Sequence, residues 1–167
     1  MHLRLYNEQT DFTYIAEWIT DERTHALWCA NLLSYPLSKD GLHQYLEELE
    51  NGSAYVYVDD EDRPDGFFIY VINEQEKSGH LRFIMVDNRA RGKGYGSDML
   101  QQFVKYAYEN TNVISVGLNV FDVNTVARKC YEKAGFTIRQ NTPDAFSYQD
   151  EIWGRYMMVH RNREYDF

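Results

Sequence analysis

The stretch Arg89-Ala90-Arg91-Gly92-Lys93-Gly94-Tyr95-Gly96 places three glycines and three basic residues between two apolar segments. The segment before it, residues 81–86, is an apolar run typical of a buried strand. The stretch is therefore predicted to form a turn that ends a strand and begins a helix. Beyond it, apolar residues recur at helical spacing, at Met99, Leu100, Phe103, Val104 and Ala107.

A glycine turn at the start of a helix is suited to binding an anion. The N–H groups of the first helical turn have no partner within the helix, and the helix dipole adds roughly half a positive charge there. Glycine also lets a phosphate approach the backbone closely. We therefore expect the stretch to hold a pyrophosphate, the alternative being a surface loop with solvated basic residues.

Two other phosphate loops are excluded by spacing. The sequence has no Gly-x-x-x-x-Gly-Lys-Ser/Thr string, which a P-loop requires. Ser97 occupies the position of the third glycine in the dinucleotide fingerprint, so that motif is also absent.

Length and composition indicate one domain over residues 1–167, because 44% of the residues are hydrophobic and can form a sizeable core. The net charge of −9 argues against a nucleic-acid partner and is compatible with a cationic substrate such as an amine. No apolar run is long enough to span a bilayer, and the N-terminus lacks the features of a signal peptide. We therefore expect no membrane partner. Cys29 and Cys130 have no paired or metal-type spacing, so we expect reduced thiols and a cytoplasmic location.

The rest of the chain alternates between strand and helix patterns, which predicts a mixed α/β (α+β) domain. Thr10-Asp11 is the expected cap of the first helix, and Asn51-Gly52 is the expected end of the third. Strand patterns cover residues 3–6, 54–58, 67–72, 113–120, 136–138 and part of 148–159, and helical patterns cover about 12–19, 22–33, 38–49 and 124–134.

The aromatic and thiol residues before residue 40 mostly indicate packing. Trp18 and Trp28 are expected near helix–loop junctions, where tryptophan usually packs in the core, with a substrate wall as the alternative. His25 and Cys29 are four residues apart, but two ligands without a third do not form a zinc site. No metal site is therefore predicted.

Two motifs together give the chain a family resemblance. The first is Arg-x-x-Gly-x-Gly at Arg91, Gly94 and Gly96, and the second is Asn…Tyr-Glu-x-x-Gly-Phe within residues 124–136. In sequence, order and separation they closely resemble the GNAT superfamily of acetyl-CoA-dependent N-acetyltransferases. The resemblance covers about residues 80–136, and it implies a GNAT-like domain with a mixed central sheet of about six to seven strands flanked by helices.

The resemblance also implies roles for individual residues, with acetyl-CoA as co-substrate and no metal. The side chain of Asn124 would contact the cofactor arm, and Tyr131 would lie near the thioester sulfur as general acid. A homodimer is left open. The backbone of Ile84, Met85 and Val86 would bond the pantetheine arm, and Arg91, Gly92, Lys93, Gly94, Tyr95, Gly96 and Ser97 would hold the pyrophosphate, mainly through N–H groups.

The chemistry of acetyl transfer agrees with these roles. A thiol has a pKa of about 8.5, so a phenol that donates a proton helps the coenzyme A thiolate to leave. An alkylamine with a pKa of about 10.4 must lose a proton before it attacks, so a base is useful. Asn119 stands where some N-terminal acetyltransferases of the superfamily carry a glutamate, and it cannot take that proton. His80 is the candidate base, because other members place a carboxylate near this position, and the alternative is a structural histidine.

The sequence therefore predicts transfer of the acetyl group of acetyl-CoA to a primary amine by direct attack in a ternary complex. A small amine is favoured over a protein N-terminus because the chain is acidic. Acidic walls in the acceptor cleft would indicate a polycation, and an open groove would indicate a peptide. The competing hypothesis is a non-catalytic acyl-CoA-binding or regulatory domain, which Asn119 permits and Tyr131 argues against.

Overall fold

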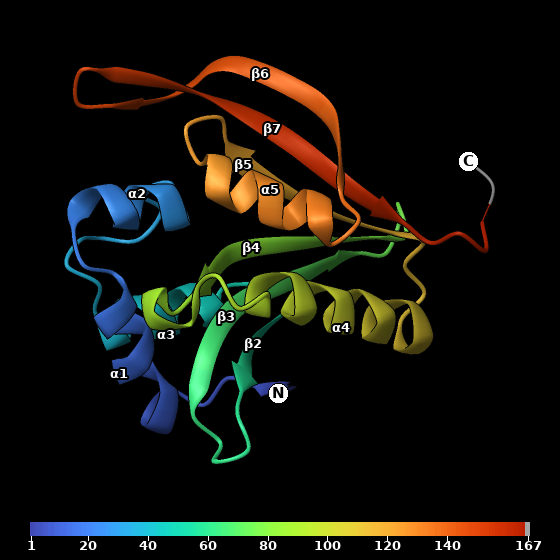
Figure 1. Cartoon of the computed structure of the whole chain (residues 1–167), viewed down its shortest axis with the longest axis horizontal. Coiled ribbons are helices and arrows are strands. Elements are labelled where there is room, and N and C mark those ends of the chain that lie inside the picture. The colour runs from blue at the N-terminus through green and yellow to red at the C-terminus, as the bar shows by residue number, and fades with distance from the viewer. Residues whose placement is uncertain (166–167) are drawn as a thin grey trace.

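The computed structural model describes residues 1–165, and the last two residues of the predicted domain, 166 and 167, lie outside this part (Figure 1). The strands are β1 (His2–Leu5), β2 (Gly52–Val58), β3 (Pro64–Asn73), β4 (Ser78–Val86), β5 (Ser115–Phe121), β6 (Thr137–Tyr148) and β7 (Glu151–Arg161). The helices are α1 (Glu8–Trp18), α2 (Glu22–Cys29), α3 (Lys39–Glu47), α4 (Tyr95–Asn110) and α5 (Thr125–Lys133), with a short 3-10 helix at Asn88–Ala90.

The seven strands form one sheet in the order β1-β2-β3-β4-β5-β7-β6, which confirms the predicted mixed sheet flanked by helices. Neighbouring strands are antiparallel except β4 and β5, which are parallel because the α4 crossover connects them. One face packs on α4 and α5 around Phe103 and Leu118, and the other packs on α1–α3 around Ile15 and Phe67. Figure 1 shows α1 and α3 beside the first strands, α2 between α1 and the β6–β7 hairpin, and this hairpin extending over β5. None of the helices within residues 1–165 is long and apolar enough to cross a membrane.

Two predicted helix boundaries are wrong. The cap of α1 is Asn7, whose side chain accepts a hydrogen bond from the Gln9 N–H, and the expected Thr10-Asp11 lies inside the helix. An asparagine offers the same capping oxygen as the expected residues, so the pattern alone permitted either start. The third helix ends at Glu47, and Asn51-Gly52 leads into β2 instead.

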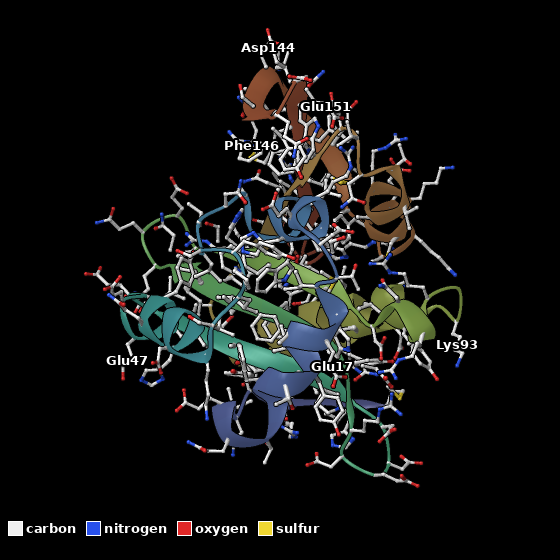
Figure 2. All side chains as sticks on the ribbon, turned by 90° about the vertical axis from the view of Figure 1, so that its left-hand side faces the viewer. Glu17, Glu47, Lys93, Asp144, Phe146 and Glu151 are labelled. Atoms are coloured by element: carbon white, nitrogen blue, oxygen red, sulfur yellow. The ribbon has the colours of Figure 1, made fainter. Side chains whose placement is uncertain are left out.

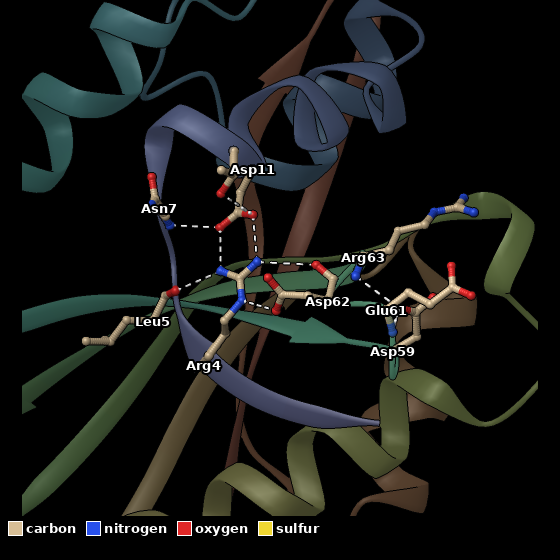
Figure 3. Close-up of polar contacts among 9 residues, drawn as sticks. Arg4, Leu5, Asn7, Asp11, Asp59, Glu61, Asp62 and Arg63 are labelled. Atoms are coloured by element: carbon tan, nitrogen blue, oxygen red, sulfur yellow. Dashed lines mark hydrogen bonds and ion pairs between the residues drawn. The ribbon is translucent and has the colours of Figure 1, made fainter.

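Asp11 does not cap α1. Its side chain is fully buried and forms a polar network with Arg4 (Figure 3). The Arg4 guanidinium donates to both Asp11 carboxylate oxygens at 2.8 and 2.9 Å, and to the Asp62 carboxylate at 2.7 Å. The Asn7 N–H also donates to Asp11, at 2.8 Å. The network connects β1, α1 and the β2–β3 loop, and it holds the pKa of the Asp11 carboxyl below its ordinary value, because these hydrogen bonds outweigh the effect of burial.

A bulge in β4 opens the sheet at its centre. Phe83 has a φ of 53°, and the register between β3 and β4 shifts at this point. The Trp28 indole N–H donates to the Phe83 carbonyl oxygen at 2.7 Å, which gives that carbonyl a partner from α2. Pairing between β4 and β5 ends at Leu81 and Leu118. The two parallel strands therefore diverge beyond this pair, toward the glycine stretch.

The β6–β7 hairpin covers the opening from the α2 side. Phe146 and Trp153 stack with ring centroids 5.4 Å apart, and Phe146 lies 5.0 Å from Phe121 of β5. An ion pair between Arg23 of α2 and Glu151 of β7 joins the helix to the hairpin. Figure 2 labels Phe146 and Glu151 on this hairpin, which stands above α2 in that view.

Candidate active site

One cavity of about 730 Å³ lies where β4 and β5 diverge. It brings together the predicted general acid Tyr131, the candidate base His80 and nearly every predicted cofactor-binding residue. Lys93 is the exception, because it is exposed and does not line the cavity. The cofactor-binding residues on its wall are Ile84, Met85, Val86, Arg91, Gly92, Gly94, Tyr95, Gly96, Ser97 and Asn124.

The glycine stretch has the geometry of an anion-binding turn. Gly92 and Gly94 have φ values of 79° and 78°, in the left-handed region that favours glycine. Gly94 is the N-cap of α4 and has no side chain to bond the first-turn amides. Arg91 lines the cavity here, and so does Lys133 of α5, whose Nζ lies 4.0 Å from the position a Gly94 Cβ would take. Sequence reasoning missed Lys133, which occupies a variable position of the second motif.

Gly96 serves helix packing. A Cβ at this position would lie 2.8 Å from the Cys130 sulfur of α5 and 3.5 Å from a methyl group of Val86. The last glycine of the motif therefore lets α4 and α5 approach closely, so that α5 carries Tyr131 to the cavity wall.

Gly96→Ala is expected to destabilise the fold by about 2 kcal/mol, because the added methyl group overpacks the α4–α5 contact. Cys130→Ala in the same chain should restore most of the loss, since it removes the atom that the methyl group meets. Gly117→Ala is the matched control, because its Cβ has no contact closer than 3.5 Å. Thermal unfolding of the unmodified chain, Gly96→Ala, the double variant and Gly117→Ala checks this. A loss of stability in the double variant as large as in Gly96→Ala would contradict it.

The backbone of β4 beyond the bulge has one occupied and one free edge. On the β3 side, Met85 and Val86 pair with Phe67 and Gly66. On the β5 side, the described chain supplies no ladder partner after Leu81. An extended polar ligand can therefore add to this edge as a strand does.

Tyr131 lies on the cavity wall with its phenol largely buried, at 7% exposure. No described residue within 1–165 forms a hydrogen bond with its hydroxyl, so its proton is available to a ligand. Burial raises the pKa of this phenol and Arg91 opposes the shift, so the group stays protonated at neutral pH. Asn124 caps α5, with its side-chain oxygen accepting from the Ala127 N–H at 3.3 Å, and its amide N–H₂ group has no partner within the described chain.

His80 lies on β4 beside Gly117 of β5, with its Nδ1 atom 3.8 Å from the position a Gly117 Cβ would take. Burial lowers the pKa of this imidazole to about 4, and the positive charges of Arg82 and Arg155 add to the effect. The imidazole is therefore neutral at pH 7 and can accept a hydrogen bond, but it is a weak base.

The part of the cavity that faces α2 is aromatic and cationic, and sequence reasoning missed most of it. Its ring walls are Trp28, Phe83, Phe121 and Phe146, so Trp28 is both a core residue and a wall residue. Arg82 and Arg155 also line it. No three potential metal ligands gather anywhere in residues 1–165. The aromatic content of β5 and of residues 146–153 was visible in the sequence, but their meeting depends on the sheet order.

The comparisons with known proteins agree with this fold. The model of the acetyltransferase (GNAT) family matches residues 5–136. A spermidine N-acetyltransferase from Vibrio cholerae, in complex with CoA and spermine, is 18% identical with a TM-score of 0.81, over 96% of this chain and 94% of that one. A chimera of the Vibrio cholerae enzyme with hSSAT is 17% identical with a TM-score of 0.80, over 98% of both chains. A putative phosphinothricin N-acetyltransferase is 18% identical with a TM-score of 0.69, over 96% of this chain and 97% of that one. The chain therefore belongs to the GNAT family of acetyltransferases.

Proposed function

We propose that this chain transfers the acetyl group of acetyl-CoA to the primary amine of a small molecule, by direct attack in a ternary complex. The observation that carries the proposal is a single cavity lined by the glycine turn, by the free edge of β4 and by the Tyr131 phenol. The small-molecule acceptor is supported by the β6–β7 hairpin, which covers the cavity on the α2 side. The solved spermidine N-acetyltransferase with CoA and spermine has the same fold and a small amine bound.

The donor fits the residues present. Residues 91–97 would hold the pyrophosphate, with first-turn amides of α4 donating and Arg91 supplying charge. The free edge of β4 at residues 84–86 would pair with the pantetheine arm, and the unengaged amide of Asn124 would contact it. Bound acetyl-CoA supplies the thioester carbonyl that the amine attacks.

The chain's own groups then move protons. In the transfer a C–N bond forms and the C–S bond breaks, so the sulfur needs a proton and the amine nitrogen must lose one. Tyr131 would donate to the sulfur, because its buried phenol is protonated at neutral pH. The candidate base His80 would accept the amine proton directly or through water. The positive charge of Arg82 and Arg155 helps, since it disfavours an ammonium and so favours the neutral, attacking amine.

The pH dependence of kcat/KM tests the state of His80. With a pKa of about 4, the imidazole is already neutral across pH 6–9. We therefore expect kcat/KM to rise with pH up to the pKa of the free amine, with no break near 6.5. The control is His80→Gln, which should lower the rate without changing the shape of this profile. A break near 6.5 that disappears in His80→Gln would show that the imidazole titrates at its ordinary value and would contradict the expectation.

A thiol-release assay with acetyl-CoA over a panel of amines tests the proposed function itself. Turnover that depends on the amine supports it. The alternative, a non-catalytic acyl-CoA-binding or regulatory domain, predicts that calorimetry detects CoA binding while no amine releases the thiol. We also place the enzyme in the cytoplasm, which is supported by two cysteines that are both free.

A further inference from the structure

The charges that line the cavity are opposite to those of the chain as a whole. The chain has a net charge of −9, yet no aspartate or glutamate lies on the described wall of the cavity. The cationic side chains on the wall are Arg82, Arg91, Lys133 and Arg155. A polyamine carries several positive charges and needs carboxylates to bind it, so this wall is unsuited to a polycation.

The four cations divide into two groups. Arg91 and Lys133 flank the glycine turn, where a pyrophosphate would use their charge. Arg82 precedes the bulge, roughly 13 Å along the strand from the last residue of β4. Arg82 donates to the Tyr45 hydroxyl of α3 at 3.1 Å, which places it on the α1–α3 face of the sheet.

Arg155 joins Arg82 on the same face. It pairs with Phe121 in the β5–β7 ladder, and it lies two residues after Trp153 in β7, so the two side chains share a face. Trp153 packs against α2 on that face. Both guanidinium groups act on the pKa of His80, so their positive charges converge at the candidate base. The second group of cations therefore lies where the acceptor would enter, beside the aromatic walls.

Within the described part of the chain, neither arginine has an anionic partner. Within residues 1–165 no carboxylate lies within 4.0 Å of the Arg82 or Arg155 guanidinium. Arg82 is partly buried, and a partly buried guanidinium without a counter-charge is costly. Arg155 is more exposed but also lines the cavity, and the planar donors of both guanidinium groups match the two oxygens of a carboxylate. Arg82 uses one donor on Tyr45 and keeps the others for a ligand.

We propose that the acceptor is a small amine that also carries a carboxylate, such as an amino acid with an apolar or aromatic side chain. Its carboxylate is bound between Arg82 and Arg155, its apolar body lies against Trp28, Phe121 and Phe146, and its amine faces the thioester. This inference rests on the proposed function, whose donor side it leaves unchanged. It keeps the small amine expected from the acidic composition but sets aside a polycation, because the acidity of the chain does not extend to the cavity wall.

The test compares L-amino acids, the corresponding amino-acid amides and spermidine as acceptors for the purified chain. We expect kcat/KM, corrected for the neutral fraction of each amine, to be at least about tenfold higher for amino acids than for their amides. Arg155→Gln and Arg82→Gln should each raise KM for the amino acid about tenfold and leave KM for acetyl-CoA within about twofold. Arg139→Gln is the matched control, because Arg139 is exposed on β6 and does not line the cavity.

Reversing the charge at Arg155 gives a second test of the carboxylate-binding role. Arg155→Glu should weaken amino-acid acetylation further than Arg155→Gln and improve acetylation of spermidine. Preferred acetylation of spermidine by the unmodified chain, with no change in acceptor KM in either glutamine variant, would overturn the inference and leave the proposed function intact. If CoA binds but no amine in the panel is acetylated, the proposed function fails and this inference fails with it.

Discussion

Replacing Tyr131 with phenylalanine is expected to lower kcat about 100-fold, while the affinity for acetyl-CoA changes little. The substitution keeps the ring, which packs in the core between α5 and the sheet, and removes only the hydroxyl. No described residue within 1–165 forms a hydrogen bond with that hydroxyl, so its removal breaks none and should leave stability nearly unchanged. Steady-state kinetics with a saturating amine, together with calorimetric titration of acetyl-CoA, measure the two quantities.

The matched control is Tyr95→Phe, which removes a hydroxyl from another cavity-lining tyrosine at the glycine turn. It should change kcat by less than about threefold, because a phenol at the proposed pyrophosphate site would take no part in proton transfer to the leaving thiolate. A Tyr131→Phe enzyme with undiminished kcat would remove Tyr131 from the mechanism. A large loss of acetyl-CoA affinity would make it a binding residue instead.

Replacing Arg4 with methionine is expected to destabilise the protein by about 3 kcal/mol, because it leaves the fully buried Asp11 carboxylate without its cation. For a chain of this length that corresponds to a fall in Tm of roughly 6 to 12 °C. Denaturant unfolding at pH 7 measures the free energy. Asp62→Asn is the control, because Asp62 is exposed and contacts the same guanidinium, and it should cost less than about 1 kcal/mol.

The pH dependence of this loss has a definite sign. In the unmodified chain the folded pKa of Asp11 is lowered, so its stabilising effect is present above the unfolded value of about 3.9 and is lost as pH falls through the folded value. In Arg4→Met the same carboxyl is buried without a cation, which raises its folded pKa above 3.9. Lowering the pH from 7 to 5 should therefore narrow the difference in stability between the unmodified chain and Arg4→Met. Adding Asp11→Asn to Arg4→Met should remove most of that difference. A difference that widens toward pH 5 would contradict this account.

The donor side of the site was predictable because its signals are local. The strand, the glycine turn and the helix that follow one another around Gly92–Gly96 are adjacent in sequence, and each reflects hydrogen bonds and backbone conformations within a few residues. The second motif likewise places Asn124 and Tyr131 on one short helix. Their spacing therefore indicated both the fold and the cofactor before any contact was known.

The helix boundary at Asn7 and the full length of β6 were not predictable in the same way. Whether Asn7 or Asp11 caps α1 depends on Arg4, which takes the Asp11 carboxylate. The strand pattern at residues 136–138 is only the beginning of β6, which continues to Tyr148 as a largely exposed edge strand with polar residues and a proline. An edge strand without an alternating apolar face has no periodic signal in the sequence. The strand can therefore be identified only from its pairing with β7 in the structure.

The sequence by itself determined the family, and it led to the predictions of the donor and of Tyr131 as the acid, because these depend on groups that lie close together along the chain. Only the tertiary structure places the side chains on which the acceptor proposal rests. The bulge at Phe83 receives its hydrogen bond from Trp28, 55 residues away, and Arg155 reaches the cavity through strand pairing with β5. Composition gave an acidic chain, but the charge that a substrate meets depends on which side chains the sheet order brings to one cavity. That selection is made by long-range packing, which no local pattern in the sequence records.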